Sequence, residues 1–163
     1  MIDPPLPLDQ IVIQVNRVFC ESSLAGHYAT LVCGEALPTG IVRIHSAGHC
    51  PVVVLQNSGI SKIESTGLPL GMFCEVSVSA TQLHLGPGEM LFLYTDGFSE
   101  ARCADEEYGL DRMTNVLRQN HGKRPAEVIA TCMRDLQAFV DIPPFDDVTL
   151  LAIQRQSGFA YDS

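Results

Sequence analysis

Residues 90–102 read Met-Leu-Phe-Leu-Tyr-Thr-Asp-Gly-Phe-Ser-Glu-Ala-Arg, and this stretch decides the fold. Met90–Tyr94 is an apolar run between two turn signals, Gly86-Pro87-Gly88 and Thr95-Asp96-Gly97. A short apolar run bounded in this way predicts a strand buried on both faces. The run ends at the carboxylate of Asp96, and Gly97 lets the backbone bend sharply beside whatever that carboxylate holds. Asp96 therefore suits an oxygen ligand for Mg²⁺ or Mn²⁺, and an ordinary Asp-Gly turn is the alternative.

A second acidic turn lies near the C-terminus, where residues 145–153 read Phe-Asp-Asp-Val-Thr-Leu-Leu-Ala-Ile. Asp146 and Asp147 directly precede another apolar run, and Pro143-Pro144 interrupts the chain just ahead of them. Adjacent carboxylates raise each other's pKa unless a cation or solvent relieves the repulsion. If the two strands are neighbours in one sheet, Asp96 meets the Asp146–Asp147 pair. A solvated acidic turn is the alternative.

Length and composition indicate one globular domain. The chain has 163 residues, 46% hydrophobic and 18% charged, which is enough apolar side chain for a real core. The net charge of −9 argues against nucleic acid and anionic membranes as main partners. The sequence contains no apolar run long enough for a membrane span and no signal-peptide pattern at its start.

The six cysteines show neither Cys-x-x-Cys nor zinc-ligand spacing. Most lie in apolar surroundings, where a free thiol behaves as a small hydrophobe. We expect reduced core thiols in a cytoplasmic protein, in preference to disulfides or metal ligands.

Periodicity predicts an α+β fold. A helix is expected from Asp9, with Ile11, Val15 and Val18 at helical spacing. Two further helices are expected, one with Leu110, Met113 and Leu117 on its apolar face and one whose first turn holds Pro125. Short strands are expected at 28–37, 41–45, 52–55, 60–63, 75–78, 82–85, 90–94 and 148–153. This order predicts an antiparallel-rich sheet structure covered by helices.

Four segments, in this order, resemble motifs of the SpoIIE/RsbU-type phosphatases, bacterial members of the PPM class of metal-dependent serine/threonine protein phosphatases. Residues 47–51, Ala-Gly-His-Cys-Pro, resemble the family's Ala-Gly-His-x-Pro hairpin, and residues 67–71, Gly-Leu-Pro-Leu-Gly, resemble its Gly-x-Pro-Leu-Gly loop. Residues 88–101 resemble its Gly-Asp-x-Leu-Leu-Leu-Tyr-Thr-Asp-Gly-Val-x-Glu-Ala motif, and residues 146–150 its terminal Asp-Asp-Ile-Thr-Leu strand. The resemblance covers about residues 8 to 155, and we expect residues 1–155 to form one domain, with 156–163 as a tail.

The resemblance implies a fold and a chemistry. The family fold is a sandwich of two antiparallel sheets flanked by helices. Its active site holds two Mg²⁺ or Mn²⁺ ions that activate a water for attack on phosphorus. Asp96 and Asp146 match metal-ligand positions, Gly97 matches the close turn beside the metal, and Asp147 is expected outside the inner ligand set. His49 lies where an accessory metal ligand is found in related phosphatases, and a structural role for it is the alternative.

One departure from the family pattern is large. The family's upstream Asp-x-x-Gly-x-Gly motif, which supplies a bridging metal ligand, has no counterpart before Asp9. We expect the N-terminal strands of the family domain to be absent, which predicts exposed strand edges and self-association into a homodimer. We also expect Ser99 and Glu100 to cap a following helix.

Two functions remain open at this point. One is phosphoserine hydrolysis on a phosphorylated anti-sigma-factor antagonist in bacterial partner-switching signalling. The other is a catalytically incomplete module that binds such a partner without hydrolysis. We expect the chain alone to hydrolyse phosphoprotein poorly. We expect the carboxylates of Asp96 and Asp146 to lie within roughly 8 Å of each other. We expect four residues of the two neighbouring strands to be deeply buried: Leu91, Leu93, Leu150 and Ala152.

Overall fold

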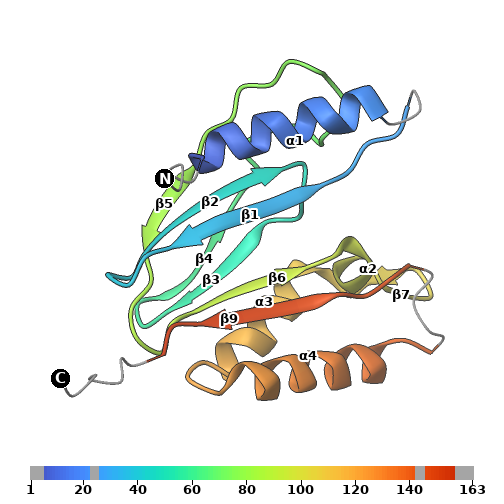
Figure 1. Cartoon of the computed structure of the whole chain (residues 1–163). Coiled ribbons are helices and arrows are strands. Elements are labelled where there is room, and N and C mark those ends of the chain that lie inside the picture. The colour runs from blue at the N-terminus through green and yellow to red at the C-terminus, as the bar shows by residue number, and fades with distance from the viewer. Residues whose placement is uncertain (1–5, 23–25, 142–145, 157–163) are drawn as a thin grey trace. The chain divides into compact units, whose positions relative to one another are not determined.

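The computed structural model describes residues 6–22, 26–141 and 146–156 (Figure 1). The chain divides into two compact units, Met1–His49 with Glu64–His84, and Cys50–Ile63 with Leu85–Ser163. The helices are α1 (Leu8–Ser22), α2 (Asp96–Ser99), α3 (Gly109–Gln119) and α4 (Pro125–Phe139). The strands are β1 (Leu31–Ala36), β2 (Ile41–Ala47), β3 (Val52–Gln56), β4 (Gly59–Ile63), β5 (Thr81–His84), β6 (Met90–Tyr94), β7 (Arg102–Cys103), β8 (Glu106–Glu107) and β9 (Leu150–Gln154).

The first unit contains an antiparallel sheet in the order β1-β2-β5, with α1 beside it. A small apolar core of Val12, Ala47 and Leu70 joins the helix to the sheet, with Phe19 and Val78 packed against it. Gly40 has a φ of 93°, and it closes the turn between β1 and β2 where a side chain would be strained. The helix predicted from Asp9 is confirmed, with Asp9 in its first turn.

The buried face of α1 differs from the predicted one. Val12 and Asn16 are buried, whereas Ile11, Val15 and Val18 are 39%, 42% and 63% exposed. Asn16 is buried because its side chain forms hydrogen bonds with backbone groups of a loop. A pattern of hydrophobic residues cannot predict this kind of burial.

A disulfide joins Cys20 to Cys74 within the first unit. The expectation that all cysteines are reduced is therefore wrong for this pair, while Cys33, Cys50, Cys103 and Cys132 are free. The two sulfurs are 54 residues apart in sequence, and the folding of a loop onto α1 brings them together. Spacing alone does not specify such a pairing.

The second unit contains the antiparallel sheet β4-β3-β6-β9, and α3 and α4 cover one of its faces (Figure 1). β3 consists almost wholly of Val and Leu, which suits a central strand with both neighbours paired. Phe92, Phe98, Tyr108, Met113 and Leu117 form the centre of the core. The α+β class and the antiparallel sheets are as predicted.

β6 and β9 are neighbours, with Leu93 opposite Leu151 and Leu91 opposite Ile153. Leu91 is buried, but Leu93, Leu150 and Ala152 are half-buried, and Leu151 and Ile153 are about half exposed, at 49% and 48%. The prediction of deep burial is thus wrong for three of the four residues. Leu150 and Ala152 on the edge strand β9 are packed against the core but only partly covered, whereas Leu93 and its cross-strand partner Leu151 are not part of that core.

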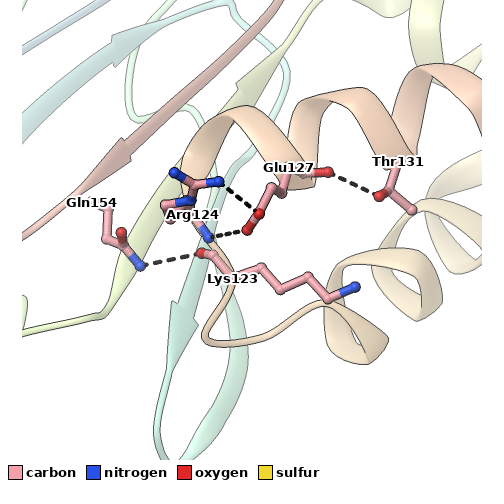
Figure 2. A network of polar contacts seen from close by, with 5 residues as sticks. All are labelled: Lys123, Arg124, Glu127, Thr131 and Gln154. Atoms are coloured by element: carbon pink, nitrogen blue, oxygen red, sulfur yellow. Dashed lines mark hydrogen bonds and ion pairs between the residues drawn. The ribbon is translucent and has the colours of Figure 1, made fainter.

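The start of α4 is tied to the end of β9 (Figure 2). Pro125 occupies the first helical turn, and the side chain of Glu127 accepts hydrogen bonds from the backbone N–H and the guanidinium of Arg124. The amide Nε2 of Gln154 donates to the carbonyl oxygen of Lys123 at 3.3 Å. These contacts fix the helix that covers β9.

Three local features differ from the sequence predictions. Residues 75–78 form no strand; the residue before them, Cys74, is bound to Asn16 and Cys20 of α1. Ser99 and Glu100 do not cap a following helix: Ser99 lies inside α2 and Glu100 ends it. The next helix begins at Gly109, after the short hairpin β7-β8. The described helices include none with the length and hydrophobicity needed to cross a bilayer.

Candidate metal centre

Asp96 lies where β6 gives way to α2. β6 ends at Tyr94, Thr95 is extended, and Asp96 is the first residue of the short helix. Its side chain is exposed, and its Oδ1 accepts a hydrogen bond of 3.0 Å from the backbone N–H of Gly97. Its carbonyl oxygen accepts from the N–H of Glu100 at 2.7 Å, so the turn holds the carboxylate in a fixed place.

Asp146 and Asp147 lie on the segment that leads into β9, and both are exposed. The Oδ1 of Asp146 accepts a 2.7 Å hydrogen bond from the N–H of Asp147. Each candidate ligand thus accepts the N–H of its own following residue, although Asp96 begins the helix α2 and Asp146 lies in a bend.

Thr95 joins the two turns. Its hydroxyl donates to the carbonyl oxygen of Asp147 at 2.8 Å and accepts from the N–H of Thr149 at 2.9 Å. Its own N–H donates to the carbonyl oxygen of Thr149 at 3.1 Å. The β6 end and the β9 start are therefore neighbours, as the sequence predicted.

Gly97 is required by this close approach. A Cβ at this position would lie 2.7 Å from the carbonyl oxygen of Asp147 and 3.1 Å from the carbonyl carbon of Asp146. Such distances leave no room for a side chain. The sharing of one cation between the Asp96 and Asp146 carboxylates, and the orientation of Asp147 away from it, stay predictions.

The two carboxylates are the kind of ligand that a divalent cation binds, but they are too few to form a two-metal centre by themselves. Carboxylate oxygens are the ligands that Mg²⁺ and Mn²⁺ prefer, and Mg²⁺ is usually held by one or two of them with several waters. Within residues 6–22, 26–141 and 146–156, no group of three or more His, Cys, Asp or Glu side chains could hold an ion. The described residues therefore show no complete ion site, and no catalytic step through such ions follows from them.

Cys50 lies in the electrostatic neighbourhood of Asp96, and sequence reasoning treated it only as a core thiol. Burial raises the pKa of Cys50, and the negative charges of Asp96 and Glu100 raise it further. Its place inside the Ala-Gly-His-Cys-Pro motif is the signal that could have identified it.

His49 belongs to the first unit, and its Nδ1 lies 3.1 Å from the hydroxyl of Thr30. The preceding Gly48 has a φ of 67°, and its N–H donates to Gly67 and to Ser65. A Cβ at Gly48 would meet the ring of Pro69 at 2.3 Å. The motifs at 47–51 and 67–71 therefore pack against each other. A role for His49 at an accessory metal stays a prediction.

The fold matches that of a known class of phosphatase domain. The structure superposes on the Mn-presoaked phosphatase domain of the cell fate determinant SpoIIE from Bacillus subtilis with a TM-score of 0.69 and 16% identity, covering 93% of this chain and 68% of that one. This likeness shows the fold, a PPM-type antiparallel architecture with helices.

Residues 1–156 match the model of the family described as Stage II sporulation protein E (SpoIIE), and the chain belongs to this family. It is 33% identical over 132 residues to Protein IcfG of Synechocystis sp., covering 78% of this chain and 21% of that protein. It is 24% identical over 152 residues to the phosphoserine phosphatase RsbU of Bacillus subtilis, covering 90% of this chain and 45% of RsbU. The chain thus spans less than half the length of these curated relatives.

Proposed function

We propose that this chain is a phosphatase domain that hydrolyses phosphoserine on a protein, with Asp96 and Asp146 as metal ligands. The observation that supports this proposal best is the joining of the two acidic turns by Thr95, in a chain of the SpoIIE family. Gly97 permits the approach of the turns, and Asp147 contributes its backbone carbonyl to their connection.

The expected cofactor is Mn²⁺ or Mg²⁺. Two oriented carboxylates provide anionic oxygens for a hard cation, and water completes the coordination shell of such ions readily. A two-metal centre needs at least one further ligand from outside the described residues. His49 is the candidate for an accessory position.

The proposed substrate is a phosphorylated anti-sigma-factor antagonist, and the proposed setting is cytoplasmic partner-switching signalling. The naming of one relative as the phosphoserine phosphatase RsbU supports this assignment. The acidic net charge of −9 fits a protein partner better than a nucleic acid.

A second candidate function is recognition of the same partner without hydrolysis. The absence, among the described residues, of a third metal-ligating side chain near the pair favours this alternative. The two functions differ in turnover, because a binding module forms a complex and releases no phosphate.

The deciding experiment measures Mn²⁺ binding by calorimetry and phosphate release from a phosphoserine protein, for the wild-type chain and three variants. If the proposal holds, Asp96→Asn and Asp146→Asn weaken Mn²⁺ binding by tenfold or more, about 1.4 kcal/mol, and remove any turnover, while Asp147→Asn binds nearly as the wild type does. Phosphate release that is slow in the wild type and absent in Asp96→Asn supports a phosphatase. Stable binding of the phosphoprotein with no release by any variant supports the binding module. Equal Mn²⁺ binding by all four chains would reject Asp96 and Asp146 as ligands.

A further inference from the structure

The Cys20–Cys74 disulfide connects the last turn of α1 to a long irregular loop between β4 and β5. The Cα atoms are 5.6 Å apart, within the usual range for a disulfide. Cys20 is half-buried, whereas Cys74 is exposed to solvent. Cys74 thus lies at the surface, where a reductant in solution can approach the disulfide without unfolding of the unit.

The disulfide is one of three contacts that hold this loop to α1. The buried side chain of Asn16 donates to the carbonyl oxygens of Phe73 and Cys74, at 2.9 and 3.2 Å, and accepts from the N–H of Gly71 at 3.0 Å. Phe19 lies against Gly71, where a Cβ would be 2.5 Å from its ring. Asn16, Phe19 and Cys20 lie on neighbouring turns of the helix, so these contacts form one continuous attachment.

The parts of the loop before and after Gly71 are attached by different contacts. Leu70 and Ala29 exchange backbone hydrogen bonds of 2.7 and 3.0 Å, and Pro69 packs on Gly48. Beyond Gly71, residues 72–78 have no helix or strand pairing, and Met72 and Phe73 are 45% and 57% exposed. Asn16 and the disulfide hold the start of this outer part, and Val78 at its end packs against the small core that includes Val12.

We propose that Cys20 and Cys74 form a reversible redox site that a small thiol or dithiol reduces. The redox state of this site controls the attachment of residues 72–78 to α1. Exposed disulfides are the ones that exchange readily, whereas shielded ones resist reduction. The site lies apart from the candidate metal ligands in the sequence and is independent of the proposed hydrolysis.

The exchange balances as a two-electron reaction. A thiolate of the dithiol attacks the exposed Sγ of Cys74, the Cys20–Cys74 bond breaks, and Cys20 leaves as a thiolate that takes a proton. The second thiolate of the reagent then attacks its own sulfur in the mixed disulfide and releases Cys74. The reagent ends as a disulfide and the protein as two thiols. Oxidation by the disulfide form of the reagent reverses each step.

Reduction leaves Asn16 and Phe19 in place, so the expected effect is local. The outer loop should open more often while α1 and the inner loop stay attached. The four free cysteines provide internal references, because burial raises the pKa of Cys33, Cys50 and Cys132, and Cys103 hydrogen-bonds to Asp141.

The test titrates the folded chain with mixtures of reduced and oxidised dithiothreitol, followed by acid quenching, alkylation and peptide mass spectrometry. Limited proteolysis with chymotrypsin is measured on the same redox mixtures before quenching. We expect Cys20 and Cys74 to become alkylated together at native circular dichroism, and cleavage after the exposed Phe73 to rise by about tenfold or more when the loop opens. A Cys20→Ser/Cys74→Ser variant should show the faster cleavage without reductant, and Cys33→Ser should behave as the wild type does.

Three results would overturn the proposal: alkylation of both cysteines before any reductant is added, reduction that occurs only in denaturant, or an unchanged rate of cleavage after Phe73 following complete reduction. The wild-type measurements decide among these results even if the double variant does not fold.

Discussion

The hydroxyl of Thr95 donates a 2.8 Å hydrogen bond to the carbonyl oxygen of Asp147, and the N–H of Thr149 donates back to the same hydroxyl at 2.9 Å. One side chain thus fixes the segment after Asp146 to the residue before Asp96. The two candidate ligands come from turns 50 residues apart in number, 96 and 146. Their approach therefore depends on this hydroxyl as well as on the pairing of β6 with β9.

Replacing Thr95 with Val keeps the shape of the side chain and removes both hydrogen bonds. We expect a loss of about 1 kcal/mol in the free energy of unfolding, because both hydrogen bonds are lost while water can reach the exposed residues Asp147 and Thr149. Urea denaturation measures the loss. Thr95→Ser keeps the hydroxyl and is the control, and equal stability of Val and wild-type chains would show that the hydroxyl is not needed.

Replacing Gly97 with Ala introduces a Cβ at 2.7 Å from the carbonyl oxygen of Asp147. We expect about 1–3 kcal/mol of destabilisation and weaker Mn²⁺ binding, since the Asp146–Asp147 backbone must move away from Asp96. The control is Gly67→Ala, where the nearest atom would be at 3.6 Å, an ordinary contact. A Gly97→Ala chain as stable as Gly67→Ala would contradict the close approach.

The sequence predicted the elements of the sheets because their signals are local. Met90–Tyr94 is a strand with the predicted bounds, and Pro125 begins a helix as expected. From the residues alone, the Asp96 and Asp146 turns could be expected to meet only if their strands were neighbours, and the pairing of β6 with β9 meets that condition. Family resemblance, more than periodicity, supplied the roles of these residues.

The features that sequence reasoning missed depend on contacts between distant segments. Asn16 is buried because its amide satisfies the backbone of residues 71–74, and no hydropathy pattern encodes that arrangement. The Cys20–Cys74 bond arises from the same contact of loop and helix. The composition of β9 predicted burial on both faces, but Leu150 and Ala152 pack against the core while the alternating residues Leu151 and Ile153 are about half exposed.

Replacing Asn16 with Ala leaves three backbone groups of residues 71–74 without their partner. We expect a loss of about 2–3 kcal/mol in stability, because unsatisfied buried polar groups bear a desolvation penalty. Thermal unfolding with the disulfide intact measures this effect. Ser22→Ala, which removes an exposed hydroxyl of the same helix bonded to Val18, should change the stability by less than about 0.5 kcal/mol. Similar values for both variants would show that Asn16 contributes no more than a surface residue.

The thiol of Cys50 offers a test of cation binding that does not require turnover. Burial first, and then the charges of Asp96 and Glu100, raise its pKa, so at pH 8 it reacts slowly with iodoacetamide. Asp96→Asn removes one of these negative charges, which lowers the pKa of Cys50, increases the thiolate fraction and speeds alkylation.

Mn²⁺ bound at Asp96 offsets the same charge, and so it should accelerate alkylation of Cys50 in the wild type but not in Asp96→Asn. Cys132, whose pKa is raised to about 12 by burial and by the charge of Asp135, should react at one unchanged slow rate in every sample. If Mn²⁺ leaves the Cys50 rate of the wild type unchanged while Asp96→Asn raises it, Asp96 influences the thiol but binds no cation.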